Sequence, residues 1–384
     1  MRLLATLGAS DINSKQKYIY EGTIYEEYFS FLALQKALDI ASEDTYVIGT
    51  SKTIGLLKKK CGDDEALLKN FKEVNDNIAI DDFFSLCLGF MGKDTYLDVT
   101  QGFRHMPMTL LLSSITAANF EDKSIKDILY AKTLDSSCNP SNAVCTFEFY
   151  SMLLYLDMAS IATSIDSFCA SYSTPLLKVS YPKFVSLYAS LDWLSRHLVG
   201  NNLTYAIELA KKTKSKIEPL RQSPLSPLLP KLEDEIDFLI SLETKKEYER
   251  FFEGAKRYFQ KELLLNSVTT LFEAVTAFLD YLVTKEELSF AYRDFRSGKQ
   301  TICKEQKDKY KRRNCQKKAL KAFVDKNKTH PILNQAFAHQ LDELDKMRNL
   351  SAHAFIDEKS SIDYETKLQE KIIFFEGLIK RMAF

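Results

Sequence analysis

Residues 94–107 read DTYLDVTQGFRHMP, and this stretch decides the fold. Its apolar and β-branched first half predicts a strand that ends at Asp98 or Val99. A turn of polar residues follows, and it leads into the apolar residues 106–120, MPMTLLLSSITAANF, which predict a helix. A strand that passes through a polar turn into a helix is part of a βαβ unit, so the stretch predicts strands joined by helices.

The remainder of the first 135 residues or so alternates in the same way. Further strands are expected at 2–8 (RLLATLG), as two short pieces about Gly22 within 17–29 (KYIYEGTIYEEYF), at the start of 45–53 (TYVIGTSKT) and at 126–134 (KDILYAKTL). Helices are expected at 29–38, at about 66–77 and at 80–91. Short apolar strands separated by helices predict an α/β domain with a mainly parallel sheet, which we place at residues 1–145.

From about Val144 onward the pattern becomes that of long helices. Residues 145–168 carry apolar residues along their whole length, and 181–199 carry an apolar stripe of helical period that ends before Gly200. The segment at about 218–231 contains four prolines and cannot form one continuous helix, so we expect a loop within the helical domain, with an interdomain linker as the alternative. The second domain is therefore expected to be all-α and to cover residues 146–384.

Composition narrows the class of protein. The chain has 52 basic and 52 acidic residues, so any nucleic-acid site has to be a local patch. Seven cysteines, an odd number with no C-x-x-C pair, argue against a disulfide framework and a zinc knuckle, and they favour a reducing compartment. No signal-peptide core and no uninterrupted apolar run near 18 residues is present, so we expect a cytoplasmic protein without membrane contact.

One segment is markedly basic. Residues 296–328 contain thirteen Lys or Arg against three Asp or Glu, with Tyr310 and Phe323 among them. Such a run most often forms a solvated helix face. Because it lies just before the sequence RNLSAH at 348–353, it could also bring a polyanion to that motif.

Polar residues follow three of the expected strands. In an open α/β sheet, ligands bind beyond the carboxyl ends of the strands, where helix N-termini present free amides to anions. A glycine lets the backbone approach a ligand, hydroxyl and amide groups offer neutral hydrogen bonds, and an arginine takes a phosphate bidentately. The candidate ligand-binding residues are Gly8, Ser10, Thr50, Ser51, Thr100, Gln101, Gly102, Arg104 and His105. The alternative interpretation is that these residues serve only as turn and helix-cap residues.

The same stretches resemble a known family. DVTQG followed by FRHMP is similar to the D-x-T-H-G motif of CRISPR-associated proteins whose N-terminal domain has the Rossmann-like CARF fold, and the order of the surrounding strands is similar too. RNLSAH matches the R-x-x-x-x-H signature of HEPN ribonucleases, whose second position is often polar, as Asn349 is here. The sequence departs from the family pattern at Gln101, where the motif has histidine, and glutamine cannot act as an acid or base.

The resemblance implies a function. CARF domains of a homodimer would bind a cyclic oligoadenylate made by a type III CRISPR complex, with cyclic tetra-adenylate the expected activator and cyclic hexa-adenylate the alternative. Binding would activate paired HEPN domains to cut single-stranded RNA in antiviral defence. A homodimer or a higher homo-oligomer is therefore expected.

Residue chemistry fits this cleavage. Asn349 and His353 share one helix face at i and i+4, whereas Arg348 flanks it, so one copy makes a poor closed site and two copies across a two-fold axis would pool their groups. A 2′-hydroxyl could attack the adjacent phosphorus without metal while His353 orients it or transfers a proton, Arg348 stabilises the phosphorane and Asn349 positions the backbone or His353. The expected products carry a 2′,3′-cyclic phosphate and a 5′-hydroxyl.

Competing interpretations remain. No His, Cys, Asp and Glu set has metal-ligand spacing, and neither G-x-x-x-x-G-K-[ST] nor G-x-S-x-G occurs, so we expect no metal or other cofactor. His197 is expected at a helix end, His330 in a turn and His339 on a helix surface, and Trp193 in the core. The main alternative function is a non-catalytic nucleotide sensor or nucleic-acid-binding protein in which RNLSAH is a coincidence. A further possibility is that the CARF-like domain degrades its own activator.

Overall fold

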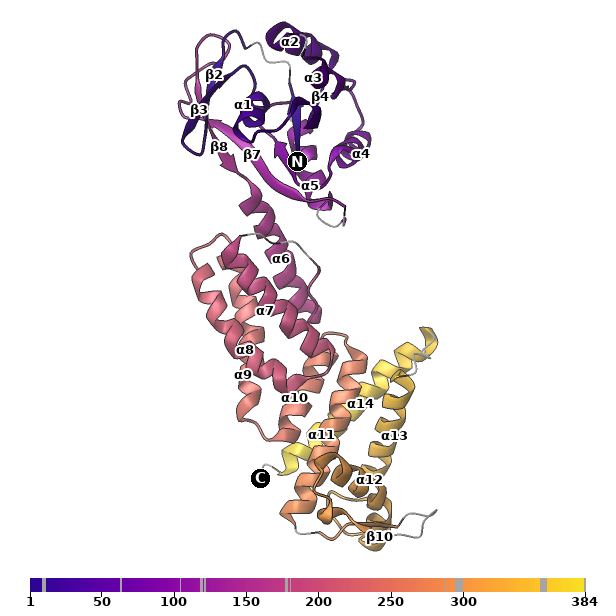
Figure 1. The fold of residues 1–384 in the computed structure, drawn as a ribbon. Helices are drawn as coiled ribbons and strands as arrows, with labels where there is room; N and C mark the ends of the chain where they lie inside the picture. Colours follow the sequence, from indigo (N-terminus) through magenta and orange to yellow (C-terminus); the bar gives the residue numbers. More distant parts are fainter. Residues whose placement is uncertain are drawn as a thin grey trace. The chain divides into compact units, whose positions relative to one another are not determined.

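The computed structural model describes residues 1–8, 12–62, 64–103, 105–117, 120, 122–176, 179, 181–286, 288–293, 300–352 and 358–382. They form two compact units (Figure 1). The N-terminal unit comprises Met1–Ile161 with Leu176–Phe184, and the helical unit comprises Ala162–Pro175 with Val185–Phe384. Each unit is described by itself.

An eight-stranded sheet forms the centre of the N-terminal unit. Its strand order is β3-β2-β8-β7-β6-β1-β4-β5. Five of the seven strand pairs are parallel, and the antiparallel pairs are β2 with β3 and β7 with β8, so the expected mainly parallel sheet is confirmed. The strands are β1 Arg2–Leu7, β2 Gln16–Tyr20, β3 Thr23–Glu27, β4 Thr45–Gly49, β5 Phe71–Glu73, β6 Thr95–Asp98, β7 Ile125–Thr133 and β8 Thr146–Ser151.

Helices cover both faces of this sheet because its central strands are apolar on both sides. Leu3, Ala5 and Leu7 of β1 pack in one core, and Leu4 between them packs in another, as the period-2 geometry of a strand requires. The first core is covered by α1 (Ser30–Ala37), α2 (Ser51–Cys61) and α3 (Glu65–Lys69), and the second by α4 (Ile80–Phe90) and α5 (His105–Ala117). The α/β class is thus confirmed.

Two segments differ from the sequence-based expectation. The helix expected at about 66–77 is wrong beyond Lys69, because Phe71–Glu73 form the short edge strand β5 beside β4. The helical character expected from about Val144 is wrong for Thr146–Ser151, because these residues form β8 between β2 and β7. No glycine or proline separates this strand from the helix after it, so the sequence offers no visible break. The N-terminal unit therefore extends beyond residue 145.

The helical unit is built around α11 (Leu264–Lys285), which is buried on most of its surface. Residues such as Leu271 and Phe278 share a core with residues of the neighbouring helices. The other helices of the chain are α6 Leu153–Ser171, α7 Pro182–Val199, α8 Leu203–Ile217, α9 Leu229–Ser241, α10 Glu247–Gln260, α12 Lys309–Lys326, α13 Gln335–Ala352 and α14 Glu358–Met382. A small hairpin, β9 (Ala291–Arg293) with β10 (Gln300–Ile302), is added to them.

The proline-rich segment lies within the helical unit, as expected. It forms two single 3₁₀ turns, Glu218–Leu220 and Ser226–Leu228, and Pro230 occupies the first turn of α9. A proline in a first turn costs no hydrogen bond, because the amides there have no partner within the helix. Trp193, expected in the core, is instead 56% exposed on α7.

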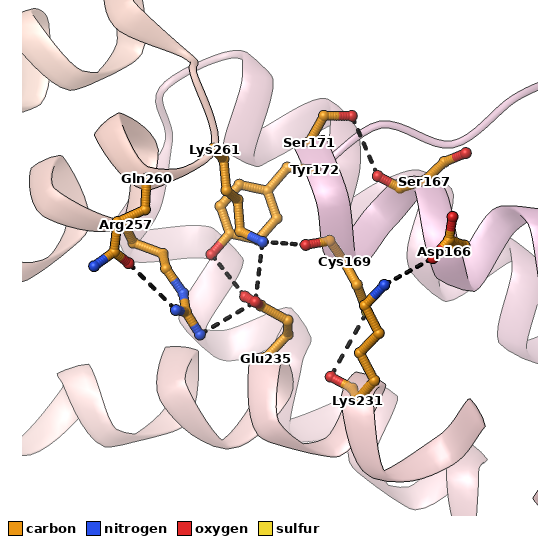
Figure 2. Close-up of polar contacts among 10 residues, drawn as sticks. All are labelled: Asp166, Ser167, Cys169, Ser171, Tyr172, Lys231, Glu235, Arg257, Gln260 and Lys261. Carbon is orange, nitrogen blue, oxygen red and sulfur yellow. Dashed lines mark hydrogen bonds and ion pairs between the residues drawn. The ribbon is translucent and has the colours of Figure 1, made fainter. Parts of the chain in front are cut away.

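A buried polar cluster joins α6, α9 and α10 (Figure 2). The Glu235 carboxylate accepts from Lys261 Nζ at 2.9 Å and from the Tyr172 hydroxyl at 3.1 Å, and Arg257 Nη2 lies 3.1 Å from it. Lys261 also donates to the carbonyl of Cys169. The side chains of Lys261 and Glu235 are only 6% and 10% exposed, so both charges are removed from water and each depends on the other.

Four of the seven cysteines form disulfide bonds, which corrects the expectation drawn from their number. Cys138 pairs with Cys145, and Cys303 with Cys315, at Cα separations of 5.8 and 5.3 Å. The number of cysteines and the lack of C-x-x-C do not predict which thiols the fold brings together. The partners lie 7 and 12 residues apart in the sequence, and the local backbone brings each pair into contact.

One helix in the described part of the chain, α6, has the length and composition of a membrane-spanning helix, with a mean hydropathy of 1.2. Core helices of soluble proteins pass the same test. Asp166 within it pairs with Lys231, and Asp157 accepts from the backbone amide of Tyr181.

Candidate functional site

The carboxyl ends of β6, β1 and β4 lie side by side at one edge of the sheet, because these strands are neighbours and parallel. Gly8 follows β1, Thr50 follows β4, and the DVTQG segment follows β6. The residues after β1 contact the segment after β6. A Cβ added to Gly8 would lie only 3.0 Å from the Gly102 carbonyl carbon. The expected convergence of polar strand ends is therefore present. We refer to this region as the strand-end site.

Gly102 shapes the loop of the strand-end site. Its φ of +144° is one that L side chains rarely adopt, and an added Cβ would lie 2.8 Å from Thr6 Oγ1. The Thr6 hydroxyl donates to the Gln101 carbonyl at 2.5 Å, which ties the loop to β1. The loop backbone thus runs directly over the end of β1.

Asp98 and Thr100 fix the loop through hydrogen bonds to its backbone and to neighbouring elements. Asp98 is buried, accepts from the Ser30 hydroxyl at 2.5 Å and accepts from the Thr100 amide at 2.9 Å. The Thr100 hydroxyl in turn accepts from the Ala131 amide of β7 at 2.8 Å. Burial raises the pKa of Asp98, and the hydrogen bonds from Ser30 and Thr100 oppose that shift. In this arrangement the aspartate of the motif organises the loop.

Two predicted ligand residues carry buried oxygens without a partner. Thr50 Oγ1 and Gln101 Oε1 are enclosed and have no hydrogen-bond partner among the described residues. Gln101 lies close to Tyr18, whose pKa is raised mainly by burial. Buried polar groups in folded proteins are normally satisfied, so two unsatisfied oxygens at the same edge of the sheet are unusual.

The remaining predicted ligand residues have less definite positions. Ser51 is exposed at the first position of α2, which Thr50 precedes. His105 is the first residue of α5, with its ring 6.4 Å from those of Phe83 and Phe103. Ser10 and Arg104 lie outside the described residues.

The second candidate site lies on α13. Arg348 Nη2 donates to Asn349 Oδ1 at 3.1 Å and is 2.8 Å from Asp345 Oδ1. The Arg348 guanidinium carbon lies 4.0 Å from the centre of the Phe272 ring of α11, which fixes its plane. His353 lies outside the described residues. The structure thus describes two of the three predicted catalytic residues, which are neighbours in the chain.

A small cavity of 120 Å³ adjoins Arg348. It lies among α11, α12 and α13, and its lining residues are Phe272, Glu273, Thr276, Tyr310, Arg313, Asn314, Lys317 and Arg348. Arg313 Nε is buried there without a hydrogen-bond partner among the described residues. Asp345, which pairs with Arg348, also accepts from Lys317 Nζ at 2.7 Å.

Sequence reasoning missed Phe272 and Asp345. No pattern in the sequence distinguishes Phe272 from other core phenylalanines. Asp345, by contrast, lies three positions before Arg348, and this i, i+3 spacing on a helix predicts an ion pair.

The other histidines lie where the sequence indicated. His197 is in the last turn of α7, and His339 is on the exposed face of α13 with Glu343 3.5 Å away. His330 is in a turn, where its Nδ1 accepts from the amides of Ile332 and Leu333. Among the described residues, no group of three or more His, Cys, Asp or Glu side chains is arranged to hold a metal ion.

Comparison with known proteins gives likenesses to solved structures but no match in sequence. No protein-family model matches the chain, and no curated protein matches its sequence. Among solved structures, Enterococcus italicus Csm6 bound to cyclic hexa-2′-fluoro-hexa-dAMP is similar over 97% of this chain and 93% of its own, with 10% sequence identity and a TM-score of 0.40.

Proposed function

We propose that this chain is a cyclic oligoadenylate-activated, metal-independent endoribonuclease that cuts single-stranded RNA in type III CRISPR antiviral defence. Residues 1–145 with β8 act as a CARF-like sensor, and the helical remainder acts as a HEPN ribonuclease. The observation that carries the proposal is the placement of the two motifs. DVTQG forms a loop over converging strand ends, and Arg348, which donates to Asn349, lines a cavity.

The strand-end site suits a neutral, polar contact with a nucleotide ring. The enclosed oxygens of Thr50 and Gln101 lack donors, and adenine amino groups or ribose hydroxyls would supply them once the loops at the strand ends open. The tightly turned backbone at Gly102 allows a ligand to approach the amides of the loop. Ser51 and His105 lie at the starts of two helices, where anions are favoured, and Ser10 and Arg104 complete the proposed set. In a homodimer, two such edges would enclose one cyclic ligand.

The proposed cleavage uses Arg348 and Asn349 of α13 together with His353. The RNA 2′-hydroxyl attacks the adjacent phosphorus, the bond to the 5′-oxygen breaks, and a 2′,3′-cyclic phosphate and a 5′-hydroxyl result. His353 orients the attacking hydroxyl or transfers its proton, and Arg348 stabilises the charge on the phosphorane. Phe272 and Asp345 hold the plane of the guanidinium, and Nη1 of Arg348 has no hydrogen-bond partner among the described residues. A second copy supplies the second arginine and histidine.

Activation then requires a difference between two arrangements of the dimer. The ligand binds the arrangement in which the two α13 helices are correctly spaced more tightly than the other, and so it shifts the population. Equal affinity of the ligand for both arrangements would rule this out. The protein is proposed to work in the cytoplasm, where the type III complex makes the activator. Degradation of the activator by the sensor domain is not part of the proposal, because Gln101 cannot act as an acid or base.

The test is a cleavage assay with a quenched fluorescent single-stranded RNA in EDTA, with cyclic tetra-adenylate, cyclic hexa-adenylate or no ligand. We expect cutting that depends on one ligand and is abolished in Arg348→Ala and in His353→Ala, with ligand binding unchanged. Arg196→Ala, which removes an exposed arginine paired at i, i+4 with Asp192, is the matched control. Intact RNA despite bound ligand would instead favour a non-catalytic nucleotide-sensing protein.

A further inference from the structure

An exposed track on α12 leads away from the cavity beside Arg348. Tyr310, Asn314, Lys317 and Lys321 are spaced i, i+4, i+7 and i+11, so they lie on one face of the helix over about 16 Å at 1.5 Å per residue. Tyr310, Asn314 and Lys321 are exposed, and Lys317 is half-buried. We refer to these four residues as the α12 track.

Two hollows make the α12 track continuous with the candidate catalytic residues. The 120 Å³ cavity beside Arg348 is lined by Tyr310, Asn314 and Lys317. A groove of 440 Å³ between α12 and α13 is lined by Lys317, Lys318, Lys321 and His339, among others. Because Lys317 lines both, a chain lying in the groove would reach Arg348 without leaving the surface of α12.

The charge of these hollows favours an anion. Together their linings carry five Lys or Arg side chains, namely Arg313, Lys317, Lys318, Lys321 and Arg348, against Glu273, Asp342 and Asp345. The last two carboxylates are engaged, Asp345 by Lys317 and Arg348, and Asp342 by Lys346 at 2.8 Å. Glu273 is paired too, with Arg313 at 3.5 Å, so the exposed Lys318 and Lys321 supply the positive charge that a phosphate backbone requires.

Tyr310 gives the α12 track an aromatic end. Its side chain is 68% exposed and makes no hydrogen bond, ring contact or cation–π contact in the part of the chain that the structure describes. An aromatic ring left exposed beside a basic groove is the arrangement that binds single-stranded nucleic acid, since every base can stack on it. Core packing does not account for this tyrosine.

We infer that the α12 track is the RNA-binding subsite of the protein, with one base stacked on Tyr310 and the backbone phosphates held by Lys317 and Lys321. This inference rests on the proposed ribonuclease function and specifies how its substrate is held. The track binds single-stranded RNA with little sequence preference, because stacking and phosphate contacts do not read base edges.

The test measures binding separately from cutting. Fluorescence anisotropy of the full-length protein with a labelled single-stranded 2′-O-methyl RNA reports binding alone, because that RNA lacks the attacking hydroxyl. We expect Tyr310→Ala to raise its Kd by about five- to a hundredfold and Tyr310→Phe to leave it unchanged. Lys321→Ala should lower the slope of log Kd against log salt by about 0.7, the value for one phosphate contact on a single strand.

Matched controls come from α8 in the same unit. Tyr205→Ala removes another exposed tyrosine and Lys212→Ala another exposed lysine, and neither should change the Kd or the slope. An unchanged Kd in Tyr310→Ala, or an equal loss in Tyr310→Phe, would overturn the inference.

Parallel cleavage of ordinary RNA separates this inference from the proposed function. Normal cutting with an unchanged KM in Tyr310→Ala would reject the α12 track and leave the ribonuclease standing. Tyr310-dependent binding by a protein that cuts no RNA would reject the ribonuclease and leave the track.

Discussion

Replacing Glu235 with alanine should destabilise the helical unit more than any exposed ion pair could. In the cluster of Figure 2 its carboxylate is the partner of Lys261, Arg257 and the Tyr172 hydroxyl. Without it, Lys261 keeps only the Cys169 carbonyl and the face of the Tyr172 ring, 4.6 Å from Nζ, while its charge stays buried. Removing one partner of a buried ion pair costs about 3–5 kcal/mol, so we expect that loss in the free energy of unfolding.

The partner substitution has a smaller expected effect. Lys261→Met replaces the ammonium with an apolar chain of similar length and leaves Glu235 paired with Arg257, which is more exposed and can follow it. Combining Lys261→Met with Glu235→Ala should cost less than the sum of the single changes, because the double variant has no unpaired lysine in the interior. This double-mutant cycle therefore isolates the free-energy cost of leaving the Lys261 ammonium buried without its carboxylate partner.

Urea unfolding followed by circular dichroism measures these differences. For a unit of this size, about 3–5 kcal/mol corresponds to a fall in Tm of about 6–20 °C. Glu243→Ala is the control, because it breaks the Lys211–Glu243 pair, in which both side chains are about half exposed (45% and 51%), and should cost about 0–1 kcal/mol. A loss for Glu235→Ala no larger than that of Glu243→Ala would refute the reasoning.

Three further predictions concern the sites and the cysteines. Gly102→Ala should weaken cyclic oligoadenylate binding at least about tenfold, because the added methyl would meet Thr6 Oγ1 at 2.8 Å and the φ of +144° is strained; isothermal titration calorimetry checks it, and normal affinity would contradict it. Asp345→Asn should reduce cleavage about tenfold or more while leaving ligand affinity unchanged, because Arg348 and Lys317 lose their shared carboxylate; an unchanged kcat in the quenched-RNA assay would argue against that role. Burial raises the pKa of the Cys169 thiol to about 11, so the folded state retains a proton that the unfolded state loses near pH 9. The thiol's contribution to the free energy of unfolding is therefore complete below pH 9 and is lost as the pH rises to about 11. Cys169 in the folded protein should therefore resist iodoacetamide at pH 8 until urea is added. Mass spectrometry of the peptide that contains Cys169 checks this, and labelling without urea would contradict the prediction.

The sequence predicted the strand ends and their shared edge well, because the signals for them are local. Each strand is a short apolar run, and parallel strands joined by helices necessarily end at one edge. The role of Asp98 was not readable, because it depends on Ser30, a residue 68 positions away that approaches only in the folded sheet. The orphaned oxygens of Thr50 and Gln101 likewise depend on how closely the loops pack.

The parts that could not be predicted depend on tertiary contacts or on weak local patterns. Three residues are too few for Phe71–Glu73 to show a strand pattern, and pairing with β4 alone makes them a strand. The position of Arg348 was predicted on a helix, but the phenylalanine beneath it comes from α11 and the basic residues beside it from α12. Both disulfides show the same limit, since cysteine spacing did not reveal which thiols meet.

The contact between Gly8 and Gly102 limits how this protein can vary. A methyl group at Gly8 would meet the main chain of Gly102, which no substitution can shorten, and a methyl group at Gly102 would meet the side chains of Thr6 and Pro107. A damaging change at Gly8 therefore has no compensating change at Gly102, because that residue is already the smallest available. In a deep mutational scan, both positions should tolerate glycine alone, and a selection for second-site suppressors of Gly8→Ala should return only true revertants at this contact.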